Sequence, residues 1–464
     1  MKKFKKTDNL YNRRNFLGSC GKMTSISLLS SILQLKMTNS ALAQLSSNQL
    51  GGYKALVCVF LNGGNDSHNM LIPFEAEEHE RYAAAKGALS IDRADMLFIR
   101  DTAGDRRGFG IHPSMPEVQT LFNQSSLAFI ANVGTLVRPT SLSDFEQGVA
   151  LPRALFSHRE QSQSWQTSIP EDIGVTGWAG RMAEIVTSSG VNTGSVRMNI
   201  STSGSNLWQT GRGVNPLVIG ESGANSAELY TDQPSVRNGM NASLEFSYRS
   251  VIKNHYNSER RNILEQNEEY ADVTEGLSVS TNFPNSSLGR QLRQVALAIA
   301  GRDRLGARRQ TFFVSIGSFD FHSDQTARHN ELMTELSQGL KAFDDAMIEL
   351  GVHDEVTTYT ASDFGRSVTN NGDGSDHGWG GNQIVMGGAV NGRRLYGEYP
   401  EDLGLGSDTD TGRGRQLPTT SVDVLHGELA TWYGIPNDGN LEDILPNIRN
   451  FWGRNRSPIL GFLD

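Results

Sequence analysis

The chain has 464 residues, of which 37% are hydrophobic, and it carries a formal net charge of -9. This composition is typical of a globular protein with a sizeable core, and no run approaches the roughly 18 to 20 apolar residues of a membrane helix. The acidic balance argues against nucleic acid and anionic membrane surfaces as main partners.

The N-terminal 43 residues differ in kind from the rest of the chain. Four lysines precede Arg13-Arg14, a mildly apolar run follows at 23–35, and Ala41-Leu42-Ala43 has a small-x-small cleavage pattern. This order resembles a twin-arginine export signal, whereas the alternative is a basic disordered tail. We therefore predict a signal peptide at 1–43, a mature chain beginning near Gln44 with a formal charge of -16, and a periplasmic or secreted location without a membrane partner.

A continuous apolar run, Leu56–Leu61, has the length of a central strand, and the polar loop Asn62–Asn69 follows it directly. The glycines of this loop either make a tight turn or let the backbone approach a ligand. Asp66 is a candidate metal ligand in this loop. Cys58 lies inside the run and is expected to be a small buried hydrophobe.

The next segments alternate between polar stretches and strands. Residues 75–111 are poor in strand signals and are predicted to form a surface excursion, whereas Leu127–Val133 is predicted to be a second strand. Ser157 is followed three residues later by Glu160, which is the pattern of a capping box. A serine at a helix N-terminus is also where the helix dipole would help a nucleophile, so Ser157 and the adjacent His158 are candidate catalytic residues.

The middle of the chain is rich in Ser, Asn and Gly. Two short strand-like runs, 196–200 and 217–219, and a charged helical stretch at 245–269 stand out in it. We predict that about 190–287 forms a polar cap inserted into one domain spanning 44–464. After it, Leu288–Ile299 has the apolar spacing of a helix.

The C-terminal half contains a predicted strand, helix and strand at 311–316, 332–347 and 356–360. In a right-handed parallel unit both strands end at the same edge of the sheet, which is where open α/β sheets bind ligands. Asp320 and His322 follow the first strand, and Asp363 follows the second. His377 comes from a glycine-rich loop fourteen residues later.

Carboxylate and imidazole groups together suit zinc, manganese or iron, whereas carboxylate-rich loops suit calcium or magnesium. Asp320, His322, Asp363 and His377 are therefore candidate metal ligands, with zinc preferred and calcium, manganese or magnesium as alternatives. Each residue also has a plain structural interpretation: Asp363 could cap a turn, and residues 371–376 could form a solvated turn or hold calcium.

Several stretches together resemble the bacterial protein family DUF1501: LVCVFLNGGNDSHNMLIP, IHPSM, SHREQSQSWQT with TGWAGR, SFDFHSDQ, and SDFGRSVTNNGDGSDHGWGG. The resemblance covers nearly all of the mature chain. This family is similar to the alkaline phosphatase and sulfatase superfamily, which implies a mostly parallel central sheet flanked by helices on both faces, with metals at its carboxyl edge. It also implies twin-arginine export, metal ligation by Asp320, Asp363 and His377, a nucleophile at Ser157, and a first ligand position in the loop that contains Asp66.

Two positions depart from the superfamily pattern. Phe364 follows Asp363 where that superfamily often has histidine, and His322 lies two residues after Asp320, where the superfamily tends to space its Asp and His four apart. Our hypothesis is an exported metal-dependent hydrolase of a small-molecule or polymeric phosphate or sulfate ester, in which Arg366 binds the anion as a bidentate donor. The alternative is a non-catalytic periplasmic binding or accessory protein with an incomplete metal site.

Overall fold

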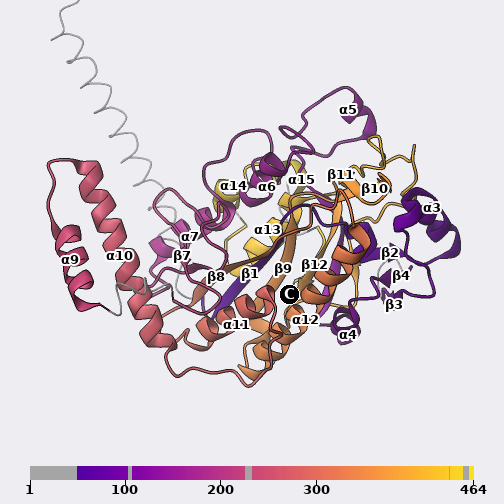
Figure 1. The fold of residues 1–464 in the computed structure, drawn as a ribbon. Helices are drawn as coiled ribbons and strands as arrows, with labels where there is room; N and C mark the ends of the chain where they lie inside the picture. Colours follow the sequence, from indigo (N-terminus) through magenta and orange to yellow (C-terminus); the bar gives the residue numbers. More distant parts are fainter. Residues whose placement is uncertain (1–49, 103–106, 225–232, 438, 453–458, 464) are drawn as a thin grey trace, which may run out of the picture.

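The computed structural model describes residues 50–102, 107–224, 233–437, 439–452 and 459–463 (Figure 1). The predicted signal peptide lies outside the described residues. No helix among the described residues is long and apolar enough to cross a membrane.

A nine-stranded sheet forms the centre of the molecule (Figure 1). Seven of the eight strands along its main path run in one direction, and β12 runs antiparallel to both of its neighbours. The prediction of a mostly parallel α/β sheet is therefore confirmed. In spatial order its strands are β13 (Leu395–Tyr396), β5 (Leu127–Gly134), β12 (Gly381–Met386), β9 (Val356–Ser362), β1 (Lys54–Leu61), β8 (Arg309–Ile316), β6 (Asn199–Ser201) and β7 (Leu217–Val218), with β14 (Thr420–Ser421) paired to β5.

Helices cover both faces of the sheet, as predicted. Successive side chains of a buried strand point to opposite faces, so the apolar side chains on each face need a layer that covers them. From β1, Val57 and Val59 pack into one apolar cluster, whereas Leu56 and Phe60 pack into another. The first cluster contains α4 (Pro116–Asn123), α11 (Ser287–Ala300) and α12 (Gln325–Glu349). The second contains α6 (His158–Thr167), α7 (Trp178–Ser189), α13 (Val422–Tyr433), α14 (Gly439–Ile444) and α15 (Ile448–Trp452).

The predicted strand-helix-strand unit is β8, α12 and β9. The buried stripe of α12 holds Leu336, Leu340 and Phe343 against the sheet. The two strands are parallel but are not neighbours, because β1 lies between them and pairs with both. Leu61 is in register with the last residue of β8 and the last residue of β9, so all three strands end at one level and their exit loops meet there.

The prediction that residues 75–111 form a surface excursion poor in strands is wrong in part. This segment contains α3 (Ala76–Lys86), η1 (Gly87–Leu89), β3 (Leu97–Arg100) and β4 (Gly108–Ile111), and β3 and β4 form a small sheet with β2 (Leu71–Pro73), just after α2 (Ser67–Met70). Strands of three or four residues, two of them interrupted by glycine or proline, give too short an alternation to be recognised from sequence.

The region predicted as an inserted cap divides into two parts. Its two short strands, β6 and β7, extend the central sheet beyond β8. Its charged helical stretch, predicted at 245–269, corresponds to α10 (Val251–Thr274). A further helix, α9 (Pro234–Glu245), pairs with α10, and both project from this edge of the molecule (Figure 1). The remaining elements are α5 (Leu142–Glu146), η2 (His353–Glu355), β10 (Arg366–Asn370) and β11 (Ser375–His377).

A buried carboxyl group on α13 predicts a pH-dependent stability. Burial raises the pKa of Asp423 to about 8, so the folded protein keeps this group protonated while the unfolded chain ionises near its ordinary pKa of about 4. Stability from this group is therefore lost as the pH rises from about 4 to about 8. We expect the unfolding midpoint of Asp423→Asn to decline less steeply with pH than that of the unaltered chain. The control Asp408→Asn, at an exposed position, is expected to keep the original decline. The same dependence of the midpoint on pH in both variants and the unaltered chain would contradict the raised pKa of Asp423.

Candidate metal centre

Two glycines after β1 let the neighbouring exit loops approach one another closely. Gly63 has φ 116°, and a Cβ there would lie 2.6 Å from the backbone nitrogen of Asp320, on the loop after β8. Gly64 has φ 85°, and a Cβ there would lie 2.3 Å from the ring of Phe364, after β9. Both glycines are thus needed for the close packing that brings the ends of β1, β8 and β9 together.

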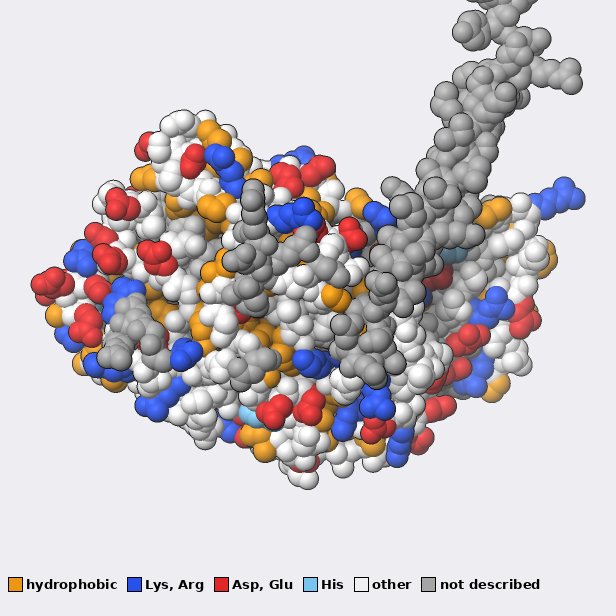
Figure 2. Space-filling view, turned by 180° about the vertical axis from the view of Figure 1, so that it is seen from behind, with side chains coloured by type: hydrophobic (Ala, Val, Ile, Leu, Met, Phe, Trp, Pro, Cys, Tyr) orange, Lys and Arg blue, Asp and Glu red, His pale blue; other side chains and the backbone are white. Residues whose placement is uncertain are grey.

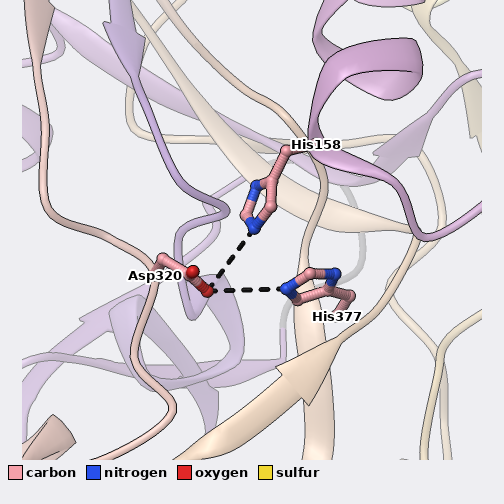
Figure 3. Close-up of side chains that lie close together, drawn as sticks. All are labelled: His158, Asp320 and His377. Carbon is pink, nitrogen blue, oxygen red and sulfur yellow. Dashed lines mark ion pairs between the residues drawn. The ribbon is translucent and has the colours of Figure 1, made fainter.

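Three side chains from separate segments converge beyond this edge (Figure 3). His158 begins α6, Asp320 follows β8, and His377 ends β11. One ligand atom from each lies within 4.8 Å of the others. Asp320 Oδ1 is 3.5 Å from Nε2 of His158 and 3.5 Å from Nε2 of His377. The site combines the predicted catalytic His158 with two predicted metal ligands.

Hydrogen bonds at the far side of two imidazoles fix which nitrogen faces the centre. Nδ1 of His158 lies 2.8 Å from Oδ2 of Asp363, and Nδ1 of His377 lies 2.7 Å from the carbonyl oxygen of Phe156. Since a carbonyl and a carboxylate only accept, both Nδ1 atoms donate, and in the neutral form of each ring the Nε2 atom carries a lone pair toward Asp320. Nε2 of His158 is buried without a hydrogen-bond partner, as a vacant ligand atom would be.

His322 places a fourth candidate ligand atom at the same centre. Its Nε2 lies 3.0 Å from Asp320 Oδ1 and 3.0 Å from Nε2 of His377. Ligands of a tetrahedral ion with bonds of about 2.0 to 2.1 Å are separated by about 3.3 Å. The Asp320 oxygen lies 3.0 to 3.5 Å from each of the three Nε2 atoms, and the His322–His377 separation is 3.0 Å, so these four separations are close to that spacing. One carboxylate with three imidazoles is a set of ligands suited to zinc, iron or manganese.

Arg366 holds Asp320 in place through a hydrogen bond. The arginine is fully buried, and its Nη1 donates to Asp320 Oδ1 at 3.0 Å, to the Gly63 carbonyl at 3.2 Å and to the Phe319 carbonyl at 3.3 Å. Burial by itself would raise the pKa of Asp320, but the hydrogen bond and charge of Arg366 outweigh it and hold that pKa below its ordinary value. Asp320 is therefore a carboxylate at neutral pH, as a metal ligand must be.

Arg366 also holds in place the segment that carries His377. Nε of Arg366 donates to the carbonyl of Ser375 at 3.1 Å and to its hydroxyl at 3.0 Å. Arg366 is also in register with His377 in the antiparallel pair β10–β11. The glycine-rich loop predicted from sequence is thus a hairpin, and residues 371–374 make the turn, which the Gly374 carbonyl closes by accepting from the Asn371 amide at 2.8 Å.

Asp363 is placed behind His158. Burial raises the pKa of Asp363, and its hydrogen bond to His158 raises the pKa of that histidine in turn. A carboxylate in this position orients a histidine ligand and makes its other nitrogen a better donor. Predicted as a metal ligand, Asp363 instead contacts the cluster through His158, with its Oδ1 buried and unpaired.

A substitution at Asp363 tests this orienting role. We expect Asp363→Asn to keep the fold while lowering metal affinity by about 10- to 100-fold, because an amide cannot hold the imidazole in one tautomer as a carboxylate does. Metal titration with a chromophoric chelator measures the affinity, with Asp345→Asn on the exposed side of α12 as the matched control. An unchanged affinity would show that Asp363 does not position His158.

Ser157 takes the N-cap position of α6, as predicted, but without a side-chain bond to the helix amides. Its hydroxyl donates to the carboxylate of Glu160, and this bond lowers the pKa of Glu160. The capping box is therefore not formed. Ser157 is next to His158 in the chain, which keeps it near the cluster.

Asp66 lies in a second, fully buried polar group. Lys86 Nζ is 2.7 and 2.6 Å from the two oxygens of Asp66, and Gln325 also donates to this carboxylate. Gln325 in turn accepts from Ser375 at 2.6 Å, which connects this group to Arg366. A cavity of about 380 Å³ lies beside it, with Gln325, His112 and His329 in its wall. Asp66 is thus neutralised by a lysine, a partner that sequence reasoning missed because Lys86 ends α3, 20 positions further along the chain.

An aromatic ring lines the centre where the superfamily pattern has histidine. Phe364 lies 4.8 Å from His158 and 4.8 Å from His377, measured between ring centroids. Its side chain offers no ligand atom. Together with the Lys86 pairing of Asp66, this means that neither Phe364 nor Asp66 adds a free ligand atom to the cluster.

The fold and site define an α/β protein with a cluster of histidine and carboxylate side chains at the carboxyl edge of a mostly parallel sheet. The chain belongs to the family described as "Protein of unknown function (DUF1501)", whose model matches residues 53–413. The family resemblance of the sequence is therefore confirmed. No curated protein matches the chain.

Among solved structures, the chain is similar to Ps i-CgsB in complex with k-i-k-neocarrahexaose, at 12% identity and a TM-score of 0.36, over 86% of this chain and 77% of that one. It is also similar to the C-terminal periplasmic domain of EcEptC from Escherichia coli in complex with Zn, at 10% identity and a TM-score of 0.28, over 73% of each chain. A third is the soluble domain of lipooligosaccharide phosphoethanolamine transferase A from Neisseria meningitidis, at 9% identity and a TM-score of 0.33, over 89% of this chain and 94% of that one.

Proposed function

We propose that the chain is an exported hydrolase of phosphate or sulfate esters that uses one divalent metal ion, with zinc preferred. The observation that carries this proposal is the convergence of Nε2 of His158, His322 and His377 on Asp320 Oδ1, with the Nε2 atom of His158 buried and without a hydrogen-bond partner. These four side chains would hold the ion. When bound, it supplies a Lewis acid for an ester oxygen and lowers the pKa of water.

The remaining groups of the site position these ligands. Asp363 holds His158 through its Nδ1–H, and Arg366 holds Asp320 while donating to the backbone oxygens of Gly63 and Ser375 on two other segments. Because Arg366 is fully buried and directed at these atoms, we assign it the positioning of Asp320 rather than contact with a substrate anion. The orienting groups come from different loops, so the site is formed only in the folded chain.

Two groups could make the attack on the ester. Ser157 is at the positive end of α6, and its hydroxyl hydrogen is already directed at the Glu160 carboxylate, which can accept it. Attack by water is the alternative. A Ser157→Ala variant distinguishes them, since it removes activity in the first case and leaves most of it in the second.

A non-catalytic binding or accessory role is the second candidate, and Phe364 favours it. The ring removes a ligand position next to His158 and His377 and makes one wall of the site apolar. Two-metal sites clamp both the attacking and the leaving oxygen, whereas a single ion does not. A protein of this kind would bind an anionic ester without turning it over.

A panel of aryl phosphate and aryl sulfate esters tests the two candidates. The proposal expects hydrolysis of at least one ester by the zinc-loaded protein, lost in His377→Ala and retained in His255→Ala on the distant α10. Absence of turnover across the panel, with zinc-dependent binding of the same esters, would instead support the accessory role. Absence of both would contradict the proposed site.

A further inference from the structure

The helical hairpin α9–α10 projects from the sheet edge near β7 (Figure 1). Only the C-terminal part of α10 packs closely on the body, where Asn267 and Tyr270 are buried. Further along, Glu259 pairs with Arg197 at 2.9 Å. Ile252 lies seven residues before Glu259, so the end of the hairpin extends about 10 Å beyond this last ion pair.

The hairpin tip, residues 246–256, exposes large apolar side chains. Val251 is 83% exposed, Ile252 82%, Phe246 61% and Tyr256 56%. These are four of the eleven large apolar side chains that the described residues expose, gathered in one short segment. Exposed apolar residues that cluster in this way mark an interaction site, whereas scattered ones do not.

Aromatic and basic groups accompany these apolar residues. The rings of Phe246 and Tyr248 lie 4.9 Å apart, and Lys253 Nζ lies 5.4 Å from the centre of the Tyr248 ring. Residues 233–263 contain five Lys or Arg and two Glu, whereas residues 264–274 contain four acids and no base. The outer part of the hairpin is therefore basic in an otherwise acidic chain, and Figure 2 shows a basic side chain projecting from its end.

We propose that the hairpin tip docks the protein on an anionic phospholipid surface. Apolar and aromatic side chains beside Lys and Arg are the combination that enters the interface of such membranes. The net negative charge of the chain argues against this partner for the body, but charges more than about 8 Å away are screened at physiological salt. The tip thus meets the lipid through its own positive charge.

A second copy of the chain is the other occupant to consider. Side-by-side pairing of two hairpins needs an apolar stripe along the whole helix. Between Tyr256 and the end of α10, the one large apolar residue that is exposed is Ile263, with an exposed fraction of 41%. A cluster confined to the end of a projection instead fits contact with a plane, which favours the lipid surface.

Sedimentation with vesicles of phosphatidylglycerol and phosphatidylcholine, compared with phosphatidylcholine alone, tests the proposal. We expect the full chain to bind the anionic vesicles, and Val251→Asp with Ile252→Asp to weaken binding at least about tenfold. Arg249→Gln is expected to weaken it about fivefold. The matched control is Ile173→Asp with Val175→Asp, since these residues are 55% and 77% exposed elsewhere. Residues 1–49 are the same in the unaltered chain and in every variant. A difference in vesicle binding between the tip variants and the unaltered chain therefore results from the hairpin tip.

Two results would overturn the proposal. One is equal binding of the tip variants and the unaltered chain to anionic vesicles, or no preference for anionic over neutral vesicles. The other is a halved mass of the tip variants in light scattering with unchanged vesicle binding, which would assign the tip to a second copy of the chain.

Discussion

Replacement of Asp320 by alanine is expected to abolish both metal binding and ester hydrolysis. Asp320 Oδ1 is the atom on which the three imidazoles converge, and it is the one carboxylate of the donor set. Its removal also leaves Arg366 as an unpaired buried cation that repels a metal ion. We expect bound metal to fall from about one ion per chain to less than about a tenth, and turnover to fall at least about a hundredfold.

The control for this experiment is Asp408→Ala, which removes an exposed carboxylate that is not part of the cluster. Elemental analysis and turnover of the same ester are measured on both variants, with circular dichroism to confirm folding. Retention of a full equivalent of metal by a folded Asp320→Ala protein would contradict the ligand assignment.

Replacement of Lys86 by methionine is expected to have the largest effect on stability. Lys86 and Asp66 are both fully buried and pair at 2.6 Å, so the variant leaves a carboxylate without its countercharge. Breaking a buried pair from one side costs about 3 to 5 kcal/mol. Denaturant unfolding measures this loss, and the double variant Lys86→Met with Asp66→Asn is expected to recover a large part of it.

The same variants test whether Asp66 has the metal role predicted from sequence. Because its two oxygens face Lys86 and Gln325, we expect folded Lys86→Met with Asp66→Asn to bind as much metal as the unaltered chain. A loss of metal from the double variant, without a loss of metal from Gln325→Ala, would return Asp66 to the ligand set.

The general position of the site could be predicted from the sequence because it follows from topology. Apolar runs that end abruptly in Asp or His mark strand ends, and parallel strands bring those ends to one edge. This reasoning placed Asp320 and Asp363 correctly near each other, although it made their strands neighbours. The strand between them, β1, comes from more than 200 residues earlier in the chain.

The division of roles within the site could not be predicted. His158 was considered a catalytic group because it follows a serine at a helix start, and its bond to Asp363 joins residues 205 positions apart. Arg366 was assigned to a substrate anion, since the sequence does not reveal that its guanidinium would be buried beneath Asp320. Such contacts depend on which loops meet in space, and no local pattern records them.

X-ray absorption spectroscopy of the zinc-loaded protein measures the proposed coordination of the metal directly. We expect one zinc ion per chain with about three imidazole nitrogens and one carboxylate oxygen at about 2.0 to 2.1 Å. A spectrum without imidazole scattering, or a chain that takes up no metal when folded in zinc-replete cells, would contradict this coordination.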